Sequence, residues 1–335
     1  MAAEMFDRTP TTGIIIFEAL IVLATIISIF YLGKIKKNII PRYFIVLAGI
    51  FIFEMFTAPM WNNYHLGVWA YLYRDVSWIL TMGWATCILL SVTLTDHYFT
   101  RLSAQRRFFV SVFFMMIAGI IGESLVVNLG IRTYSPEVQD AVWGYLPLLN
   151  IPANTFYYVP VFTALVIGFY GYWSLVLDDK PVMPMKKRKW GRDFLIALAG
   201  ILLFEIMIEP MVTNQDLPKW SYVYKDISFL ITGGWIVIVW LALKFTDRFF
   251  IGLELGYRFI LYLIAIAIIA LPIEAWLISE KIRAYGPSAT KNLTGINLPG
   301  LHVPVEVMFA IPLYFALIVA FIRYWEIILD NRRLQ

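Results

Sequence analysis

The chain alternates between long apolar segments and short polar ones. Segments of about 20 residues with very few charges are typical of helices that cross a membrane. The pattern predicts nine such helices, at 12–33, 42–60, 75–95, 107–128, 151–176, 193–212, 225–244, 257–279 and 303–327. No small-residue cleavage site follows the first segment, so it is predicted to be retained. The expected fold class is an all-α integral membrane protein.

Two parts of the sequence match at an offset of 151 residues. The tetrapeptide LAGI at 47–50 recurs at 198–201. Charged and aromatic residues coincide in the same register: Glu54 with Glu205, Glu123 with Glu274, Arg132 with Arg283, and Tyr134 with Tyr285. Each part contains four predicted helices, and an even number gives both parts the same orientation. The sequence therefore predicts one extra N-terminal helix and a parallel tandem repeat of two four-helix units.

These observations divide the chain into four regions. We expect an N-terminal transmembrane helix at 1–41, a first four-helix repeat at 42–178, a cytoplasmic basic linker at 179–192 and a second four-helix repeat at 193–335.

Basic residues gather in alternate loops, most densely at 34–42, 101–107 and 180–192. An excess of Lys and Arg marks the cytoplasmic side of a membrane protein. The amino terminus is therefore predicted outside and the carboxyl terminus in the cytoplasm. The net charge of +4 is spread over these short loops. The expected partner is the lipid bilayer, with no nucleic acid.

Four glutamates lie inside apolar segments near their predicted outer ends: Glu54, Glu123, Glu205 and Glu274. A carboxylate in hydrocarbon costs about 2.5–3.5 kcal/mol, unless it faces protein or water, pairs, or is protonated. One interpretation is a proton-handling or cation-binding site. The other is structural, with each glutamate pairing with polar groups of its own hairpin, such as Arg132 or Arg283. For Glu54 and Glu205 we expect a mainly structural role, in which the following loop supplies the polar partners.

Aromatic residues concentrate in the loops after these glutamates. Trp69, Trp220, Tyr134 and Tyr285 fit an interfacial aromatic belt, or the lining of a pocket for a flat apolar molecule. Asp75 and Asp226 precede inward-running helices and are expected to cap them.

Haem and metal chemistry find little support in the sequence. His65, His97 and His302 all lie outside the deep parts of the predicted helices, so haem is not expected. No His, Cys and carboxylate residues have metal-ligand spacing, so no metal site is predicted. A carotenoid or a quinone is the candidate cofactor.

The end of the second part has a distinctive order of residues, EAWLISEKIRAYGPSATKNLTGINLPGLHVPVEVMF from Glu274 to Phe309. An acidic residue ends a helix, an aromatic loop follows, and Gly-Ile and Pro-x-Glu precede the next helix. This resembles the lycopene cyclase domain and the membrane carotenoid hydratases. The resemblance implies intramembrane carboxylates that protonate a polyene, with Glu274 and Glu306 as the catalytic pair. Asn154 lies near the place of Glu306 in the first part, and Val307 replaces the second acid of the motif.

Three functions follow from these observations. The missing second acid favours a non-catalytic transmembrane subunit of a larger membrane complex, which packs other subunits and an apolar cofactor such as a quinone, carotenoid or lipid. The alternative is a membrane enzyme that acts on an isoprenoid or carotenoid by proton transfer from an intramembrane glutamate. A transporter with its site at the repeat interface is the third.

Overall fold

The computed structural model describes the chain except for residues 1–6, 180–189, 292, 302 and 331–335. Most of the predicted basic linker, and His302, therefore lie outside the described residues. Within the described part, nine helices are long and apolar enough to cross a membrane. The predicted all-α membrane architecture is confirmed at this level, and the helix ends differ from the predicted ones by a few residues.

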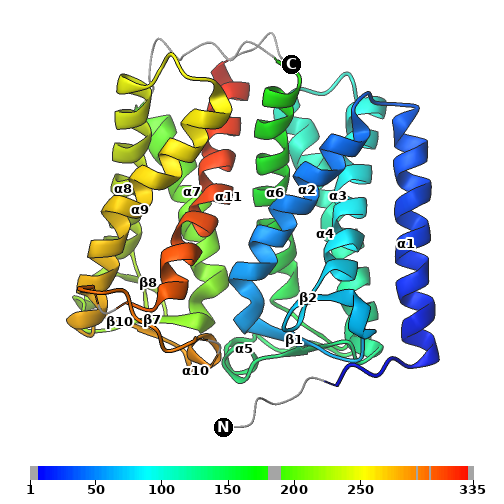
Figure 1. The fold of residues 1–335 in the computed structure, drawn as a ribbon, viewed down its shortest axis with the longest axis horizontal. Coiled ribbons are helices and arrows are strands. Elements are labelled where there is room, and N and C mark those ends of the chain that lie inside the picture. Colours follow the sequence, from blue (N-terminus) through cyan, green and yellow to red (C-terminus); the bar gives the residue numbers. More distant parts are fainter. Residues whose placement is uncertain (1–6, 180–189, 292, 302, 331–335) are drawn as a thin grey trace. The chain divides into compact units, whose positions relative to one another are not determined.

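The long helices follow one another along the chain (Figure 1). They are α1 (Thr12–Gly33), α2 (Ile39–Thr57), α3 (Trp78–Tyr98), α4 (Ala104–Asn128), α6 (Thr155–Leu177), α7 (Trp190–Ile208), α8 (Phe229–Phe249), α9 (Leu255–Ser279) and α11 (Val305–Asp330). Two short helices lie in loops, α5 (Pro136–Ala141) and α10 (Pro287–Thr290).

Short strands, which the sequence analysis did not anticipate, shape the loops at one end of the helices. They are β1 (Trp61–Asn63), β2 (Tyr71–Tyr73), β3 (Val76–Ser77), β4 (Arg132–Tyr134), β5 (Tyr145–Leu146), β6 (Ile151–Pro152), β7 (Val212–Asn214), β8 (Tyr222–Tyr224), β9 (Ile227–Ser228) and β10 (Arg283–Tyr285). They form five antiparallel pairs: β1 with β4, β2 with β3, β5 with β6, β7 with β10, and β8 with β9. The pairs β1–β4 and β7–β10 each join loops far apart in the sequence.

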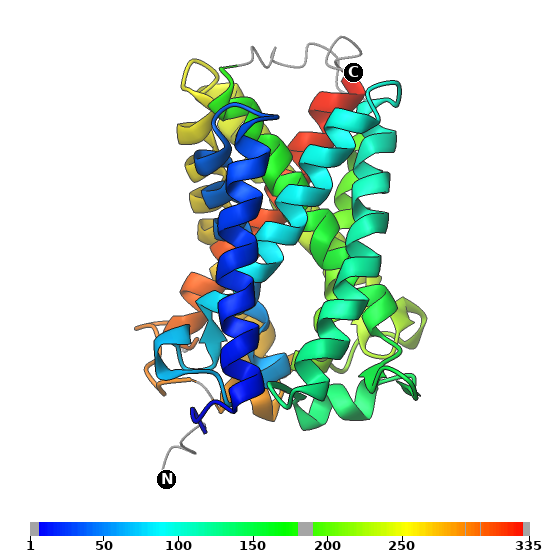
Figure 2. The same cartoon turned by 90° about the vertical axis from the view of Figure 1, so that its right-hand side faces the viewer.

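The described chain divides into two compact units at a boundary within α6: the first unit runs as far as Tyr170, and the second begins at Gly171. In the first unit α3 packs against α1, α2 and α4. Figure 2 shows α1 and α4 beside α3. In the second unit α8 packs against α7 and α9, and α11 packs against the same two helices.

The core of the first unit includes part of a loop. Leu66 and Ala70 of the loop after α2 are fully buried beside Ile14 of α1 and Ile79 of α3. The outer face of α1 is instead exposed and apolar, with Leu20, Ile26 and Phe30 among its exposed side chains. Such a face is suited to lipid contact, and the loop is a packed part of the protein.

Asp75 and Asp226 do not cap the helices that follow them, so this prediction is wrong. The N-cap of α3 is Ser77, whose side chain accepts from the Leu80 backbone N–H. Ser228 does the same for α8. The chain forms the β2–β3 or β8–β9 hairpin before the helix begins, which places each aspartate in the hairpin turn.

A close approach between α4 and α6 gives a stability prediction. A Cβ atom built on Gly119 would lie 2.5 Å from Val159 Cγ1 and 2.9 Å from the Trp84 ring. Gly119→Ala should therefore lower the free energy of unfolding by about 1–3 kcal/mol. Gly122, on the same helix, has no atom within 4 Å of such a Cβ. Gly122→Ala is the matched control and should be neutral or stabilising. Equal unfolding temperatures for the two variants in detergent would contradict this packing.

Candidate functional site

Buried polar side chains gather below the strand-bearing loop of the first unit. The first carboxyl cluster consists of Glu54, Asn63, Thr81, Glu123, Arg132 and Tyr134. They come from α2, α3, α4, β1 and β4. Glu54, Glu123 and Arg132 are each less than a tenth exposed.

Arg132 is the centre of this cluster. Its Nη1 donates to Glu123 Oε2 over 2.8 Å, and its Nε donates to Asn63 Oδ1 over 3.0 Å. The guanidinium carbon lies 5.1 Å from the centre of the Trp61 ring. The pairing of β1 with β4 sets Asn63 directly opposite Arg132. The arginine therefore joins a helix end to a strand pair.

Glu123 accepts a hydrogen bond at each of its two carboxyl oxygens. Its second oxygen, Oε1, accepts from the Tyr134 hydroxyl over 2.6 Å. Burial, together with the Glu123 carboxylate, raises the pKa of the Tyr134 phenol. Tyr134 is thus a neutral donor at physiological pH. The expected structural pairing of Glu123 with the arginine of its own hairpin is present.

Glu54 has a different environment. Its Oε2 is in hydrogen-bond contact with the hydroxyl of Thr81, on α3. The same hydroxyl lies 2.8 Å from the Ser77 carbonyl oxygen. Arg132 acts on Glu54 electrostatically. Glu54 is buried against protein as expected, but its partner comes from the returning helix and not from the loop itself.

The second unit contains corresponding contacts 151 residues later. The second carboxyl cluster consists of Glu205, Asn214, Thr232, Glu274, Arg283 and Tyr285. Arg283 donates to Glu274 Oε2 over 3.0 Å and to Asn214 Oδ1 over 3.1 Å. Tyr285 donates to Glu274 Oε1 over 2.6 Å. Glu205 contacts the Thr232 hydroxyl.

The aromatic neighbours of the two arginines differ. The Arg283 carbon lies 5.4 Å from the Trp235 ring of α8, whereas Arg132 lies over Trp61 of β1. In the second unit Tyr314 stacks on Phe204 with 4.7 Å between ring centres. In the first unit Phe53 and Phe162 lie 4.4 Å apart. Aromatic rings therefore flank the carboxyl cluster in each unit.

Other predicted site residues lie outside these clusters. Trp69 and Trp220 are 53% and 68% exposed. Trp69 packs edge-on against Trp78, and Trp220 lies 5.2 Å from the Phe229 ring. Glu306 accepts from the Thr294 backbone N–H over 2.6 Å, so one of its oxygens holds the loop before α11. Glu306 thus bonds to a backbone N–H of this loop, whereas Glu274 bonds to the side chains of Arg283 and Tyr285.

Several polar residues of these sites were not singled out from the sequence. Asn63, Thr81, Asn214 and Thr232 carry no charge, and only the fold shows that they contact the glutamates. Glu18 of α1 and Arg323 and Glu326 of α11 had a visible signal, since each is a charge inside an apolar segment. Within the part of the chain that the structure describes, no group of three or more His, Cys, Asp or Glu residues could hold a metal ion.

Comparison with known proteins finds no matching protein family, no matching curated protein and no matching solved structure for this chain.

Glu123, which pairs with an arginine, and Glu54, which contacts a threonine hydroxyl, should respond differently to substitution. Glu123→Gln removes one charge of a buried ion pair and should lower the free energy of unfolding by about 3–5 kcal/mol. Glu54→Gln keeps the shape and the hydrogen-bonding capacity beside Thr81, so its change should stay below about 1 kcal/mol. Denaturant unfolding of the purified variants measures both. A larger loss for Glu54→Gln than for Glu123→Gln would reverse our assignment.

Asp75 gives a pH prediction outside the helices. Burial raises the pKa of Asp75 to about 6. The folded protein then keeps a proton that the unfolded chain releases, so stability falls as the pH rises from about 4 to about 6. Two pKa units at about 1.4 kcal/mol each correspond to on the order of 2–3 kcal/mol.

Asp75→Asn should remove the part of this fall that is due to Asp75, and the variant should be more stable than the wild type above pH 6. Asp140 is exposed, so Asp140→Asn is the control and should keep the wild-type pH dependence. Unfolding temperatures measured across this pH range decide the matter. If the unfolding temperature of the wild type stays constant between about pH 4 and about pH 6, the assignment to Asp75 is wrong.

Proposed function

We propose that this polytopic membrane protein is an enzyme that protonates a carbon–carbon double bond of an apolar isoprenoid dissolved in the membrane. Glu54 and Glu205 are the proposed proton donors. The proposal depends mainly on one observation: the hydroxyl groups of Thr81 and Thr232 each face two acceptor oxygens but have only one hydrogen to donate.

A hydroxyl group has a single hydrogen to donate. Thr81 Oγ1 faces two acceptors, the Ser77 carbonyl at 2.8 Å and Glu54 Oε2. If the hydroxyl donates to the carbonyl, the contact with Glu54 is satisfied by a hydrogen on the carboxyl group. Thr232 has the same arrangement, with the Ser228 carbonyl at 3.2 Å and Glu205 Oε2. Both contacts of each threonine therefore fit a neutral, protonated glutamate.

Each unit thus combines two carboxyl groups with opposite environments. Glu123 and Glu274 accept from an arginine and a tyrosine, as ionised carboxylates do. Glu54 and Glu205 have hydroxyl partners. Such a separation of environments is a common basis for assigning one carboxyl group as the acid. On this basis the acid is Glu54 or Glu205, and Glu274 holds Arg283 in position.

The aromatic surroundings support chemistry that passes through a cation. Phe53, next to the acid in sequence, packs against Phe162, and Trp84 lies 5.1 Å from the same ring. Aromatic faces attract positive charge by about 0.5–2 kcal/mol each. In the second unit Tyr314 and Phe204 flank Glu205, and Glu205 acts electrostatically on Tyr314.

The proposed step balances without an oxidant or reductant. The carboxyl O–H bond of Glu54 breaks, and a C–H bond forms at the less substituted carbon of the double bond. The neighbouring carbon becomes a tertiary cation. Loss of a proton from an adjacent carbon back to the Glu54 carboxylate gives an isomer of the substrate and restores the acid. Burial of the site keeps water away from the cation.

The wider architecture proposed here has two further parts. We infer that the two four-helix units are a parallel tandem repeat, which is supported by the corresponding contacts of the two carboxyl clusters. We also infer that the amino terminus lies outside and the carboxyl terminus in the cytoplasm, because the described basic segments at 34–42 and 101–107 lie at the ends of the helices away from the strands. The loops that cover the carboxyl clusters then face outward.

Isotope exchange tests the proposed reaction. The protein is purified with its native lipid, and the lipid extract is scanned for polyene and quinone absorbance. Bound isoprenoid is then incubated with the protein in D₂O, and deuterium incorporation is measured by mass spectrometry. The wild type should incorporate deuterium, and the double variant Glu54→Gln, Glu205→Gln should be slower by at least about 100-fold.

Glu280 is an exposed glutamate, so Glu280→Gln is the matched control and should exchange as the wild type does. Unchanged exchange in the double variant would exclude Glu54 and Glu205 as acids. A wild type that binds a polyene or quinone and exchanges no deuterium would favour the non-catalytic subunit predicted from the sequence, whose test is co-purification with other membrane subunits.

A further inference from the structure

One side of α8, in the second unit, is exposed and apolar. Its exposed residues recur at intervals of three and four, which return to the same side of an α-helix. We call this stripe the α8 face, and it consists of Leu230, Gly234, Val237, Leu241 and Phe245. The four residues other than the glycine range from 40% exposed at Leu230 to 55% at Phe245. The helices α7 and α9, which pack against α8, therefore leave this side open.

The same positions of the first unit are covered by α1 (Figure 2). The residues 151 positions earlier all lie on α3, and they are Ile79, Gly83, Thr86, Leu90 and Leu94. Ile79 is fully buried in one cluster with Ile14 of α1. Thr86 is 6% exposed, and its hydroxyl lies 2.8 Å from the hydroxyl of Thr25. The later residue of α1 meets the later residue of α3, so the two helices run in the same direction.

The glycines of the two faces have different surroundings. A Cβ atom built on Gly83 would lie 3.5 Å from Ile21, so this glycine lets α1 approach closely. Gly234 occupies the corresponding place, and neither it nor Gly233 has a described atom within 4 Å of such a Cβ. Glycine weakens a helix interior, and in membranes it is typical of places where two helices pack closely. The packing of the second unit supplies no such contact for this pair.

The loop before α8 is open on the same side. In the first unit Leu66 is fully buried, and the buried Gly67 N–H donates to Glu18 of α1 over 2.7 Å. Their counterparts 151 positions later are Leu217, which is half-buried, and Pro218, which is exposed. Proline has no backbone N–H. A helix that covers the α8 face therefore needs no carboxyl group at this level.

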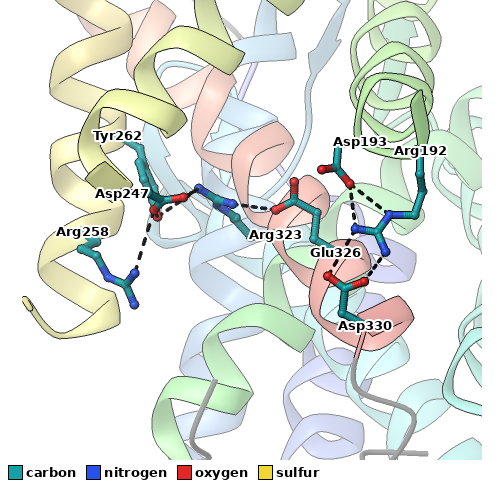
Figure 3. A network of polar contacts seen from close by, with 8 residues as sticks. All are labelled: Arg192, Asp193, Asp247, Arg258, Tyr262, Arg323, Glu326 and Asp330. Carbon is teal, nitrogen blue, oxygen red and sulfur yellow. Dashed lines mark hydrogen bonds and ion pairs between the residues drawn. The ribbon is translucent and has the colours of Figure 1, made fainter. Parts of the chain in front are cut away.

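The end of α8 away from the strands completes its polar contacts within the second unit, as Figure 3 shows. Asp247 accepts from Arg323 of α11 over 2.6 Å, and Arg258 of α9 lies 3.9 Å away. In the first unit the corresponding Asp96 pairs with Lys36, which follows α1 closely. A helix on the α8 face thus needs no basic residue to balance the aspartate.

Two cations lie on or beside the α8 face near this end. The Lys244 ammonium is 4.3 Å from the centre of the Trp240 ring, and the exposed Arg248 continues the stripe. These charges favour a partner with acidic or polar groups and disfavour a basic one. The corresponding end of α1 is followed by Lys34 and Lys36. The α1 helix of a second copy therefore fits this face poorly.

We propose that the α8 face binds a single transmembrane helix of another membrane protein. This helix runs in the same direction as α8, packs an apolar side against Gly233 and Gly234, and carries acidic or polar groups at the end next to Lys244. It has the place on α8 that α1 has on α3. The inference is independent of the proposed enzyme activity, because it involves neither Glu54 nor Glu205.

Site-directed photo-cross-linking in native membranes tests both the partner and its direction. Benzoylphenylalanine is placed at Leu230, at Val237 or at Phe245, and the attached peptide is sequenced by mass spectrometry. All three positions should attach to one apolar segment of one other protein. The attachment site should move towards the carboxyl end of that segment from Leu230 to Phe245. Ile268 of α9, which is 68% exposed, is the control and should attach to lipid alone.

Three outcomes of this experiment would contradict the proposal. The first is attachment to lipid alone at all three positions of the α8 face, which would make it an ordinary lipid contact. The second is attachment to a second copy of this chain. The third is a reversed order of attachment sites, which would mean that the partner helix runs in the opposite direction.

Substitutions that fill the space beside the glycines provide a second readout. Gly234→Leu should leave the unfolding temperature of the purified chain within about 2 °C of the wild type. It should lower the cross-linking yield at Val237 by at least about tenfold, because the added side chain occupies the partner's place. Leu241→Trp enlarges a side chain that is already exposed and should lower the yield as well.

Gly122→Leu is the matched control, because it adds the same side chain at an open position on α4 of the first unit. It should keep both the unfolding temperature and the cross-linking yield of the wild type. If the yield at Val237 is unchanged in both Gly234→Leu and Leu241→Trp, no helix packs on the α8 face and the proposal is wrong.

Discussion

The ion pair between a buried arginine and a buried glutamate controls the arrangement of each strand-bearing loop. Arg132 joins Glu123 of α4 to Asn63 of β1, and Arg283 joins Glu274 of α9 to Asn214 of β7. Neither charge is stable alone in an apolar interior, because an unpaired buried ion costs several kcal/mol. The loop therefore has one favourable position over the helices, in which Asn63 and Arg132, or Asn214 and Arg283, are opposite each other in a strand pair.

The position of the loops sets the environment of the second glutamate in each unit. The returning chain turns through a hairpin and begins α3 or α8 at a serine cap. One turn later Thr81 or Thr232 reaches the carboxyl group of Glu54 or Glu205. The same loop thus fixes one glutamate through an arginine and a second glutamate through a hydroxyl. The difference between the two carboxyl groups is a consequence of chain geometry, without any change of residue type.

The helices could be predicted from the sequence because about twenty apolar residues have few alternatives in a membrane. The pairing of Glu123 with Arg132 could be expected, since both charges lie in one hairpin. The strand pairs could not, because segments of two or three residues have no readable periodicity. Thr81 could not be assigned to Glu54, 27 residues earlier, until the packing of α2 on α3 was known. The capping role given to Asp75 failed for a related reason, since the hairpin before α3 has no clear sequence signal.

The contact between Glu18 of α1 and the backbone N–H of Gly67 has a consequence for biosynthesis. These residues are 49 positions apart, and the hydrogen bond is 2.7 Å long. When α1 leaves the ribosome, its glutamate enters the membrane before its partner has been synthesised. Until α2 and the loop after it have emerged, the Glu18 carboxyl group lacks this backbone donor, and an unpaired carboxyl group in hydrocarbon is costly. The first helix of the chain is therefore completed as a folded element only after the second has been made.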